Sequence, residues 1–391
     1  MLRRDVIKGI AAATAASAVG TRRASAQDVI RIGACLSLTG GFQTVGRQAL
    51  AGAKLYMQLN GDTVAGRKIE LIVREDSGVP DVARRVTQEM IVNDKVNIVL
   101  GGITPTALAI GQLVTQAKIP TVVIISGASV TIDRSPFMTR TSFTLGQSSM
   151  IMGDWAAKNG SKKVVTIVND WAPGAEAETA FVNAFTAGGG QVIEKIKVPL
   201  ANPDFAPFLQ RVRDLAPDSA FVYFPGQQGG TFARQFVERG LDKSNIKLIG
   251  PGDLTDDDEL PGQGDVMLGV VTAHHYSAAH PSPMNKKYVE DFKKANNFRP
   301  NFISTGGWDG MHLIYEALKK TGGKTDGEAL MAEMKGTKWE SPRGPISIDP
   351  ETRDIVQNIY MRKVEKVNGE LFNIEFATFD AVKDPMKKKA T

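Results

Sequence analysis

The sequence contains little of what metal or disulfide chemistry needs, with one cysteine and four histidines among 391 residues. A single thiol cannot form an internal disulfide or anchor a zinc cluster. Cys35 lies in an apolar run, so we expect it to be buried and inert. The adjacent His274 and His275 should point to opposite faces of a strand, with no thiols or matched carboxylates nearby. We therefore expect no metal site and no cofactor.

Motifs of covalent catalysis and nucleotide binding are also missing. There is no Gly-x-Ser-x-Gly, no His-Glu-x-x-His, and no Gly-x-Gly-x-x-Gly after the first expected strand. Residues 322–325 imitate the end of a phosphate-binding loop, but Leu318 stands where that loop needs glycine, so they indicate a helix end. The acidic run 256–259 lacks calcium-loop spacing and is interpreted as a solvated helix start. We therefore predict a binding protein and not an enzyme.

The first 26 residues predict an export signal. Arg3 and Arg4 precede an apolar, Ala-rich stretch, and residues 24–26 (Ala-Ser-Ala) form a signal-peptidase site. The twin arginine is similar to a bacterial twin-arginine signal, with the general secretory route as the alternative. No later segment is long enough to span a membrane. We expect a periplasmic protein.

The remaining chain is nearly neutral. Five of the 47 basic residues and one of the 42 acidic residues fall within 1–26, which leaves 42 basic and 41 acidic residues. Such a balance gives no overall field for nucleic acid. We therefore expect no nucleic-acid partner, and we expect a monomer.

From residue 29 onward, short β-branched runs alternate with helical patterns, which predicts parallel sheets flanked by helices. The pattern restarts after residue 140, so we expect two βαβ modules of similar size. The expected strands are 29–36, 69–73, 97–100 and 121–125 in the first module, and 163–168, 191–198, 220–224 and 247–250 in the second.

The last third has too few strands for a third module and must complete the first two. Strands are expected at 266–274, 346–348 and 356–364, and helices at 284–295, 304–320 and 327–334. The chain should therefore cross between lobes near 141–147, 272–277 and 344–358, a hinge suited to opening and closing. The predicted domains are the signal 1–26, an N-terminal lobe of 27–143 plus 275–345, and a C-terminal lobe of 144–274 plus 346–391.

Ligands of α/β sheets collect outside the carboxyl ends of parallel strands. In the first module, loops 37–44, 101–106 and 126–129 each join small or hydroxyl residues to an expected helix start. Free N–H groups and the helix dipole favour an anion there. The alternative is that the hydroxyls of Thr104, Thr106 and Ser129 serve only as helix caps. We expect these loops to hold a carboxylate.

The second module supplies the facing wall. Asp170 and Trp171 follow its first strand, Gln227 its third and Asp253 its fourth. Trp171 either stacks on a ligand ring or packs internally, and Asp253 is suited to accept from an amine or hydroxyl.

Further features extend along the whole chain after the signal: Ile32-Gly33, Gly40-Gly41, Gly52-Ala53, Glu75-Asp76, Gly101-Gly102, Arg140-Thr141, Asp204-Phe205, Gly250-Pro251 and Gly307-Trp308-Asp309. Together with the loops, they resemble the periplasmic-binding-protein type I family, and more closely its Leu/Ile/Val-binding branch of ABC-transporter receptors. The resemblance implies an α/β fold of two Rossmann-like lobes with parallel central sheets and a three-crossover hinge. It also implies a receptor that closes on a small solute and delivers it to a permease.

The resemblance also implies binding positions. In amino-acid-binding members, a Ser/Thr after the third strand holds the ligand's carboxylate; the position here is Pro105, between Thr104 and Thr106. The small-plus-hydroxyl pair after the fourth strand corresponds to Ala128 and Ser129.

Other positions depart from the family pattern. Val45, with Phe42 nearby, stands where an aromatic commonly follows the first loop. Ala172-Pro173, beside Trp171, replaces the aromatic of the second lobe, and Gly252, beside Asp253, replaces the acid that grips the ammonium. We therefore expect an aromatic or aliphatic acid at least as readily as a branched-chain amino acid. A sensory receptor with a signalling partner remains an alternative, and an exported enzyme is a less favoured one.

Overall fold

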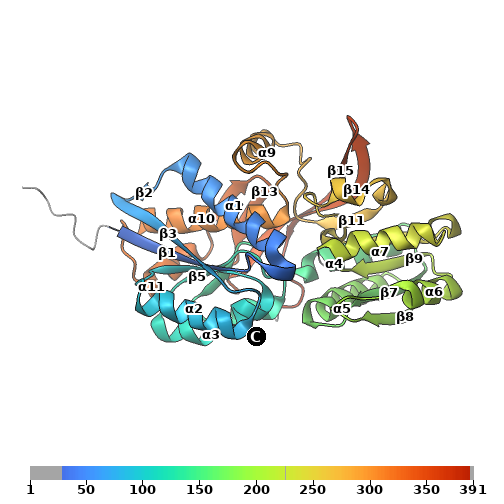
Figure 1. Ribbon diagram of the computed structural model, residues 1–391, viewed down its shortest axis with the longest axis horizontal. Helices are drawn as coiled ribbons and strands as arrows, with labels where there is room; N and C mark the ends of the chain where they lie inside the picture. The colour runs from blue at the N-terminus through green and yellow to red at the C-terminus, as the bar shows by residue number, and fades with distance from the viewer. Residues whose placement is uncertain (1–28, 225, 388–391) are drawn as a thin grey trace, which may run out of the picture.

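The computed structural model describes residues 29–224 and 226–387, so the export signal expected over 1–26 lies outside the described residues. The chain forms two α/β lobes that lie side by side, each built around its own sheet (Figure 1). The described residues therefore form the two-lobed α/β fold expected from the sequence.

The first lobe contains a six-stranded sheet in the order β2-β3-β1-β4-β5-β6. All neighbours pair in parallel except β2, which pairs with β3 in antiparallel fashion. Its central strands are almost continuously apolar because helices cover both faces. The strands are β1 (Val29–Leu36), β2 (Thr63–Val64), β3 (Arg67–Glu75), β4 (Ile98–Gly101), β5 (Thr121–Val123) and β6 (Met138–Arg140).

The second lobe contains a nine-stranded mixed sheet in the order β12-β13-β14-β11-β10-β9-β7-β8, with β15 also paired to β14. The run from β8 to β11 is parallel, and the later strands pair in antiparallel fashion. The strands are β7 (Lys163–Asn169), β8 (Gln191–Val198), β9 (Ser219–Tyr223), β10 (Lys247–Pro251), β11 (Val271–His274), β12 (Lys338–Ser341), β13 (Gly344–Ile348), β14 (Ile355–Val367) and β15 (Glu370–Val382).

Helices cover both sheets, and several begin where the sequence supplies a cap or a first-turn proline. Thr144 and Gln147 form a capping box at the start of α4, and Asn301 caps α10. The first lobe carries α1 (Gln43–Asn60), α2 (Pro80–Val92), α3 (Thr104–Ala117), α9 (Pro283–Asn296), α10 (Phe302–Lys320) and α11 (Gly327–Met334); the second carries α4 (Leu145–Lys158), α5 (Ala172–Ala187), α6 (Ala206–Leu215), α7 (Gln227–Glu238) and α8 (Leu260–Gln263).

The chain passes between the lobes after β6 and after β11. β12 and β13 form a hairpin that pairs with β14 in the second sheet, yet this segment packs on the first lobe. Trp339 donates to Asp309 of α10 at 2.9 Å, and Arg353 donates to the carbonyl of Ser135 at 2.6 Å. The expected third crossing at 344–358 stays a prediction.

Three strands were not anticipated from the sequence besides the short β2: β6, β12 and the long β15. In β15 the apolar/polar alternation is interrupted by the adjacent apolar pairs Leu371-Phe372, Phe376-Ala377 and Ala381-Val382, and there is no run of β-branched residues, so the signal for a strand is weak. β15 pairs with β14 along nearly its whole length, and this pairing stabilises the strand where the local sequence preference is weak.

Buried arginines fasten the segments that join the lobes. Arg343 donates to the carbonyl of Ser142 at 2.7 Å and to that of Thr141, in the first passage. It also pairs with Asp309 of α10 at 2.8 Å. Arg362 on β14 donates to the carbonyl of Tyr276 in the second passage.

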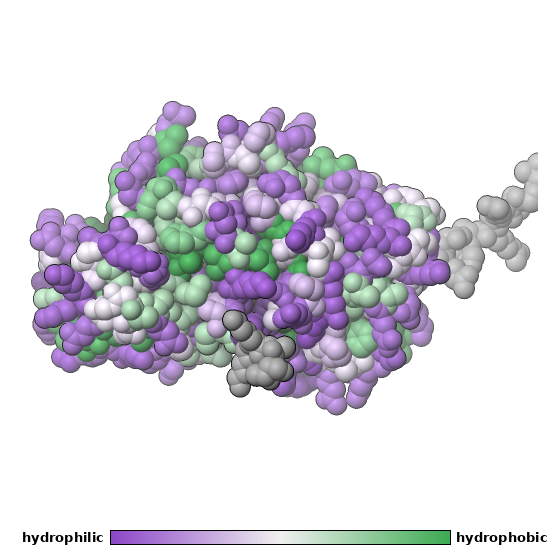
Figure 2. Space-filling model, turned by 180° about the vertical axis from the view of Figure 1, so that it is seen from behind, coloured by the Kyte–Doolittle hydropathy of each residue, from purple (hydrophilic) through white to green (hydrophobic). Residues whose placement is uncertain are grey.

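The surface is mostly hydrophilic in the view of Figure 2, with hydrophobic side chains gathered near the middle of the molecule. Among the helices of residues 29–224 and 226–387, none is both long and apolar enough to cross a membrane.

The closest helix crossing in the first lobe predicts a stability effect. A Cβ added at Gly307 on α10 would lie 2.1 Å from the carbonyl oxygen of Ala49 on α1. Gly307→Ala should therefore lower the free energy of unfolding by about 2 kcal/mol, because the helices must move apart. Gly262→Ala is the matched control, since nothing lies within 4 Å of its Cβ position. Urea unfolding of both variants is the measurement, and equal stabilities would contradict the prediction.

Candidate functional site

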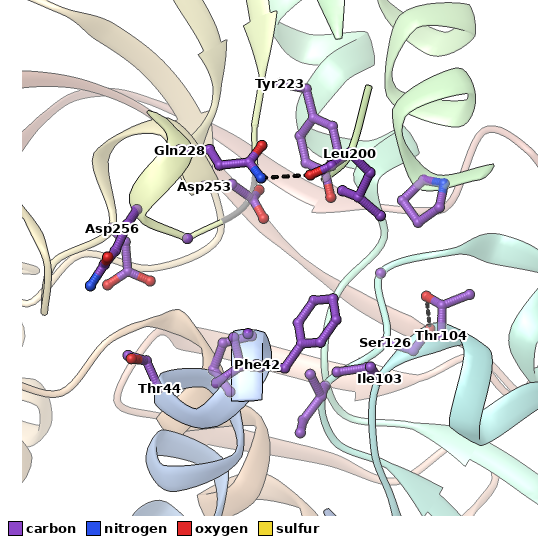
Figure 3. A pocket seen from close by; sticks show the side chains of 18 of the residues that line it. Phe42, Thr44, Ile103, Thr104, Ser126, Leu200, Tyr223, Gln228, Asp253 and Asp256 are labelled. Carbon is purple, nitrogen blue, oxygen red and sulfur yellow. Dashed lines mark hydrogen bonds between the residues drawn. The ribbon is translucent and has the colours of Figure 1, made fainter. Parts of the chain in front are cut away.

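A cavity of about 650 Å³ lies between the two lobes, at the carboxyl ends of the parallel strands (Figure 3). Loops after β1, β4 and β5 form its first-lobe wall, and loops after β7, β8, β9 and β10 form the facing wall. The start of α10 closes one side. Parallel strands leave their carboxyl ends at one edge, which is why residues far apart in sequence meet here.

The first-lobe wall is polar but uncharged. Thr104, the first residue of α3, shares a hydrogen bond of 2.7 Å with Ser126, whose hydroxyl lies 2.8 Å from that of Thr131. No side chain caps the start of α3. Hydroxyls and the free N–H groups of a helix start together form an environment suited to an anion.

No lysine, arginine or histidine occurs among the described residues that line the cavity. A buried cation lies just behind the first wall, because Arg140 donates to the carbonyl groups of Ser126 and Ala128 at 2.8 and 2.7 Å. The Arg140 guanidinium is paired with Asp354 at 2.7 Å. Arg140 thus holds the shape of the loop without entering the cavity.

Aromatic side chains form the middle of the cavity. Phe42 and Trp171, from opposite lobes, have ring centroids 6.4 Å apart and nearly parallel planes. Phe143 and Phe302 also line the cavity and pack edge to face at 5.2 Å. The indole N–H of Trp171 is buried without a partner. A flat, apolar group fits between such faces.

The second-lobe wall carries the only charges at the cavity among the described residues, namely Asp253, Asp256 and Glu259. Asp253 is 8% exposed, and its Oδ2 atom has no hydrogen-bond partner. Burial raises the pKa of the Asp253 carboxyl to about 7. Burial, followed by the charge of Asp258, raises the pKa of Glu259 to about 7. Asp256 accepts from the amide of Asn301 at 2.8 Å.

The close-up in Figure 3 shows how the two walls face each other. Tyr223, Gln228, Asp253 and Asp256 lie on the second-lobe side, and Thr104 and Ser126 lie on the first-lobe side. Gln228 is fixed by a 2.8 Å bond to the carbonyl of Leu200.

Several residues predicted from the sequence line this cavity: Phe42, Val45, Thr104, Trp171, Gln227 and Asp253. They come from both lobes and from five separate loops, and the fold brings them together.

Other predicted residues lie outside the cavity lining. Pro105 and Thr106 turn away along α3, and the Thr106 hydroxyl donates to the carbonyl of Ile103 at 3.2 Å. The carbonyl of Ala128 accepts a hydrogen bond from Arg140, and the N–H of Ser129 donates to Glu176. Asp170 is exposed to solvent. The anion-favouring environment near Ser129 is therefore occupied by a carboxylate of the chain itself.

Sequence reasoning missed several lining residues, including Phe143, Tyr223 and Asn301. Tyr223 is the last residue of β9, and Asn301 caps α10. A search that included the last residue of each strand would have found Tyr223, and a search of helix starts in the last third would have found Asn301. Asp256 and Asp257 were expected in a solvated helix start, but both are buried. No cluster of potential metal ligands occurs within residues 29–224 and 226–387.

Comparison with known proteins matches this architecture. Residues 29–369 match the family described as "Periplasmic binding protein". A Leu/Ile/Val-binding protein homolog 6 from Brucella abortus (strain 2308) is 40% identical over 92% of this chain and 93% of its own length.

Solved structures extend the similarity. A solute-binding protein of an ABC transporter from Rhodopseudomonas palustris BisB5, in complex with 3,4-dihydroxybenzoic acid, is 63% identical with a TM-score of 0.89; the match covers 92% of this chain and 99% of that one. A solute-binding protein from Rhodopseudomonas palustris HaA2, in complex with p-hydroxybenzoic acid, is 36% identical over the same shares, with a TM-score of 0.88. The chain therefore belongs to the periplasmic binding protein family, as its loop order indicated, and is a solute-binding protein of the ABC-transporter type.

Proposed function

We propose that this protein captures a single-ring aromatic carboxylic acid with a phenolic hydroxyl, such as 3,4-dihydroxybenzoate, between its lobes. The observation that carries the proposal is the division of the cavity into an uncharged hydroxyl end, an aromatic middle and a carboxyl end. The 63%-identical relative in complex with 3,4-dihydroxybenzoic acid supports this ligand class.

The ligand's carboxylate binds at the first-lobe wall. The second-lobe wall carries Asp253, Asp256 and Glu259, whose burial already disfavours negative charge and raises their pKa values, so it is unsuited to an anion. The first wall instead offers the Thr104 and Ser126 hydroxyls and the start of α3. The carboxylate supplies the acceptor that these donors need.

The aromatic ring lies between Phe42 and Trp171, and its hydroxyl reaches Asp253. A phenol can both donate and accept, so it bonds Asp253 in either protonation state. An ammonium group needs the ionised carboxylate. Because the pKa of Asp253 is about 7, only part of the protein carries that ionised form near neutral pH. This difference favours a phenolic acid over a branched-chain amino acid.

Closure of the lobes excludes water and strengthens the polar contacts. The protein then delivers the ligand to the permease of an ABC importer, acting as a monomer in the periplasm without turnover of the ligand. A signalling partner in place of the permease would leave the same pocket in use.

A ligand screen tests the proposal. Because a ligand that binds only the folded state raises the melting temperature, we expect 3,4-dihydroxybenzoate and 4-hydroxybenzoate to raise it more than benzoate, and leucine or valine not to raise it. Thermal shift followed by calorimetry is the measurement. A response to leucine or valine alone would replace the ligand class with branched-chain amino acids.

Two threonines on one helix turn form a matched pair for the carboxylate end. Thr104→Val removes a hydroxyl at the cavity, so affinity for 4-hydroxybenzoate should fall about tenfold, the effect of a hydrogen bond to a charged group. Thr106→Val removes a buried hydroxyl that bonds Ile103 and should leave affinity within about twofold. Calorimetric titration of both variants with 4-hydroxybenzoate is the measurement. Equal losses of affinity in the two variants would show that Thr104 does not bind the ligand.

The carboxyl end of the cavity, where the ligand's phenolic hydroxyl binds, is tested with a pair of aspartates. Asp253→Leu keeps the branched shape of the side chain but replaces the carboxyl oxygens with methyl groups, so affinity for 4-hydroxybenzoate should fall about tenfold while affinity for benzoate stays constant or rises. Asp170→Leu, on the exposed residue outside the cavity, should change neither. Parallel losses for both ligands in Asp253→Leu would show that Asp253 does not select the hydroxyl.

A further inference from the structure

A cluster of titratable groups lies beside the cavity, where the two lobes touch. Ser129 begins the short helix η3 (Ser129–Arg134) of the first lobe. Glu176 lies on α5 of the second lobe, and Asp384 follows β15. None of the three lines the cavity.

Ser129 joins both carboxyl groups. Its backbone N–H donates to the Oε1 and Oε2 atoms of Glu176 at 3.1 and 3.0 Å. Its hydroxyl lies 3.0 Å from Glu176 Oε1 and also bonds Asp384 Oδ2. Glu176 therefore occupies the start of η3 as a carboxylate ligand would.

If both carboxyl groups were ionised, the two hydrogen bonds of the Ser129 hydroxyl would need two hydrogens, one for each carboxylate. A serine hydroxyl has a single hydrogen, which can be donated to Glu176 or to Asp384 but not fully to both. The second hydrogen bond requires a proton on one of the carboxyl groups, which then donates to the Ser129 oxygen.

The surrounding charges do not supply a cation for this pair. Arg140 on β6 pairs with Asp354 at 2.7 Å, and Lys387 in the C-terminal segment pairs with Asp133 of η3 at 2.7 Å. Lys387 also donates to the Ser129 carbonyl at 2.6 Å and lies 3.7 Å from Asp354. Within the described parts of the chain, neither Glu176 nor Asp384 forms an ion pair of its own.

We propose that Glu176 and Asp384 share one proton across Ser129 when the lobes are closed, so that ligand capture takes up a proton. Glu176 is a positioning residue, because it holds the lobes together without touching the ligand. The part concerning ligand capture rests on the function proposed above.

The electrostatics support this arrangement. Burial raises the pKa of Glu176 to about 7, and the charge of Asp384 raises it further, against the lowering effects of the Ser129 hydrogen bonds and Arg140. Separation of the lobes would return Glu176 to water, where a glutamate pKa is about 4.3. Because the pKa is higher in the closed state, closure is favoured at low pH and this contribution is lost as the pH rises through about 7.

The experiment is calorimetric titration with 3,4-dihydroxybenzoate at pH 6, 7 and 8, in buffers of different ionisation enthalpy that report the protons taken up. Wild-type affinity should fall about tenfold from pH 6 to pH 8 through this site, as the two pKa values require. Glu176→Gln keeps an acceptor for the Ser129 N–H and a donor for its oxygen. It should therefore lose this part of the pH dependence and bind more tightly than wild type at pH 8.

Two further variants serve as controls for this experiment. Glu238→Gln, at the exposed end of α7, should behave like wild type. Ser129→Ala removes the shared hydroxyl, whose hydrogen bond lowers the pKa of Glu176, so proton uptake should be at least as large as in wild type. Glu176→Gln and wild-type profiles that run parallel, with equal proton uptake, would overturn the proposal.

A measurement of lobe closure without ligand separates this proposal from the ligand assignment. If no aromatic acid binds, the ligand class fails, but the proton should still favour the closed form of the ligand-free protein at low pH. The distance between spectroscopic labels on the two lobes should therefore increase from pH 5 to pH 8 in wild type and change little in Glu176→Gln. Parallel distance profiles would overturn the shared proton.

Discussion

The arrangement of the lobes depends on buried guanidinium groups that bind backbone carbonyls. Segments that leave one sheet and enter another cannot satisfy all their carbonyl groups within a ladder, and an unpaired buried carbonyl is costly. Arg140, Arg343 and Arg362 are each fully buried and direct several donors at such carbonyls. Each also faces a buried aspartate, which offsets the cost of burying the charge.

The same interactions shape the cavity. Arg140 holds the carbonyls of Ser126 and Ala128 away from the cleft, so the wall there presents hydroxyls and N–H groups. The second wall collects carboxyl groups whose burial leaves them short of donors. The polarity of the cavity follows from which backbone groups the buried arginines have already satisfied.

Much of this architecture could be predicted from the sequence, because parallel strands between helices are apolar on both faces and end in recognisable loops. The strand at 191–198 and the loop positions of Thr104, Trp171 and Asp253 follow from local pattern alone. What could not be predicted depends on long-range pairing. β15 forms through its contact with β14, and β12 joins the second sheet through a hairpin.

The direction in which each side chain points could not be predicted from the sequence either. Thr104 and Thr106 lie two positions apart on one helix, and only the rotation of α3 decides that the first faces the cavity. At Ser129 the sequence predicted a contact with the ligand's carboxylate, whereas in the structure its N–H donates to a carboxyl group of the chain. That carboxyl group belongs to Glu176, which a search for external ligands had no reason to consider.

The passages between the lobes also limit how the lobes can move. With these segments fastened side by side, sliding and twisting would stretch at least one of them, whereas rotation about the line that joins them stretches none. Rotation is then the motion that the passages resist least. One pair of spectroscopic labels across the cleft would follow that rotation, and a second pair placed elsewhere on the lobes would test whether sliding or twisting accompanies it.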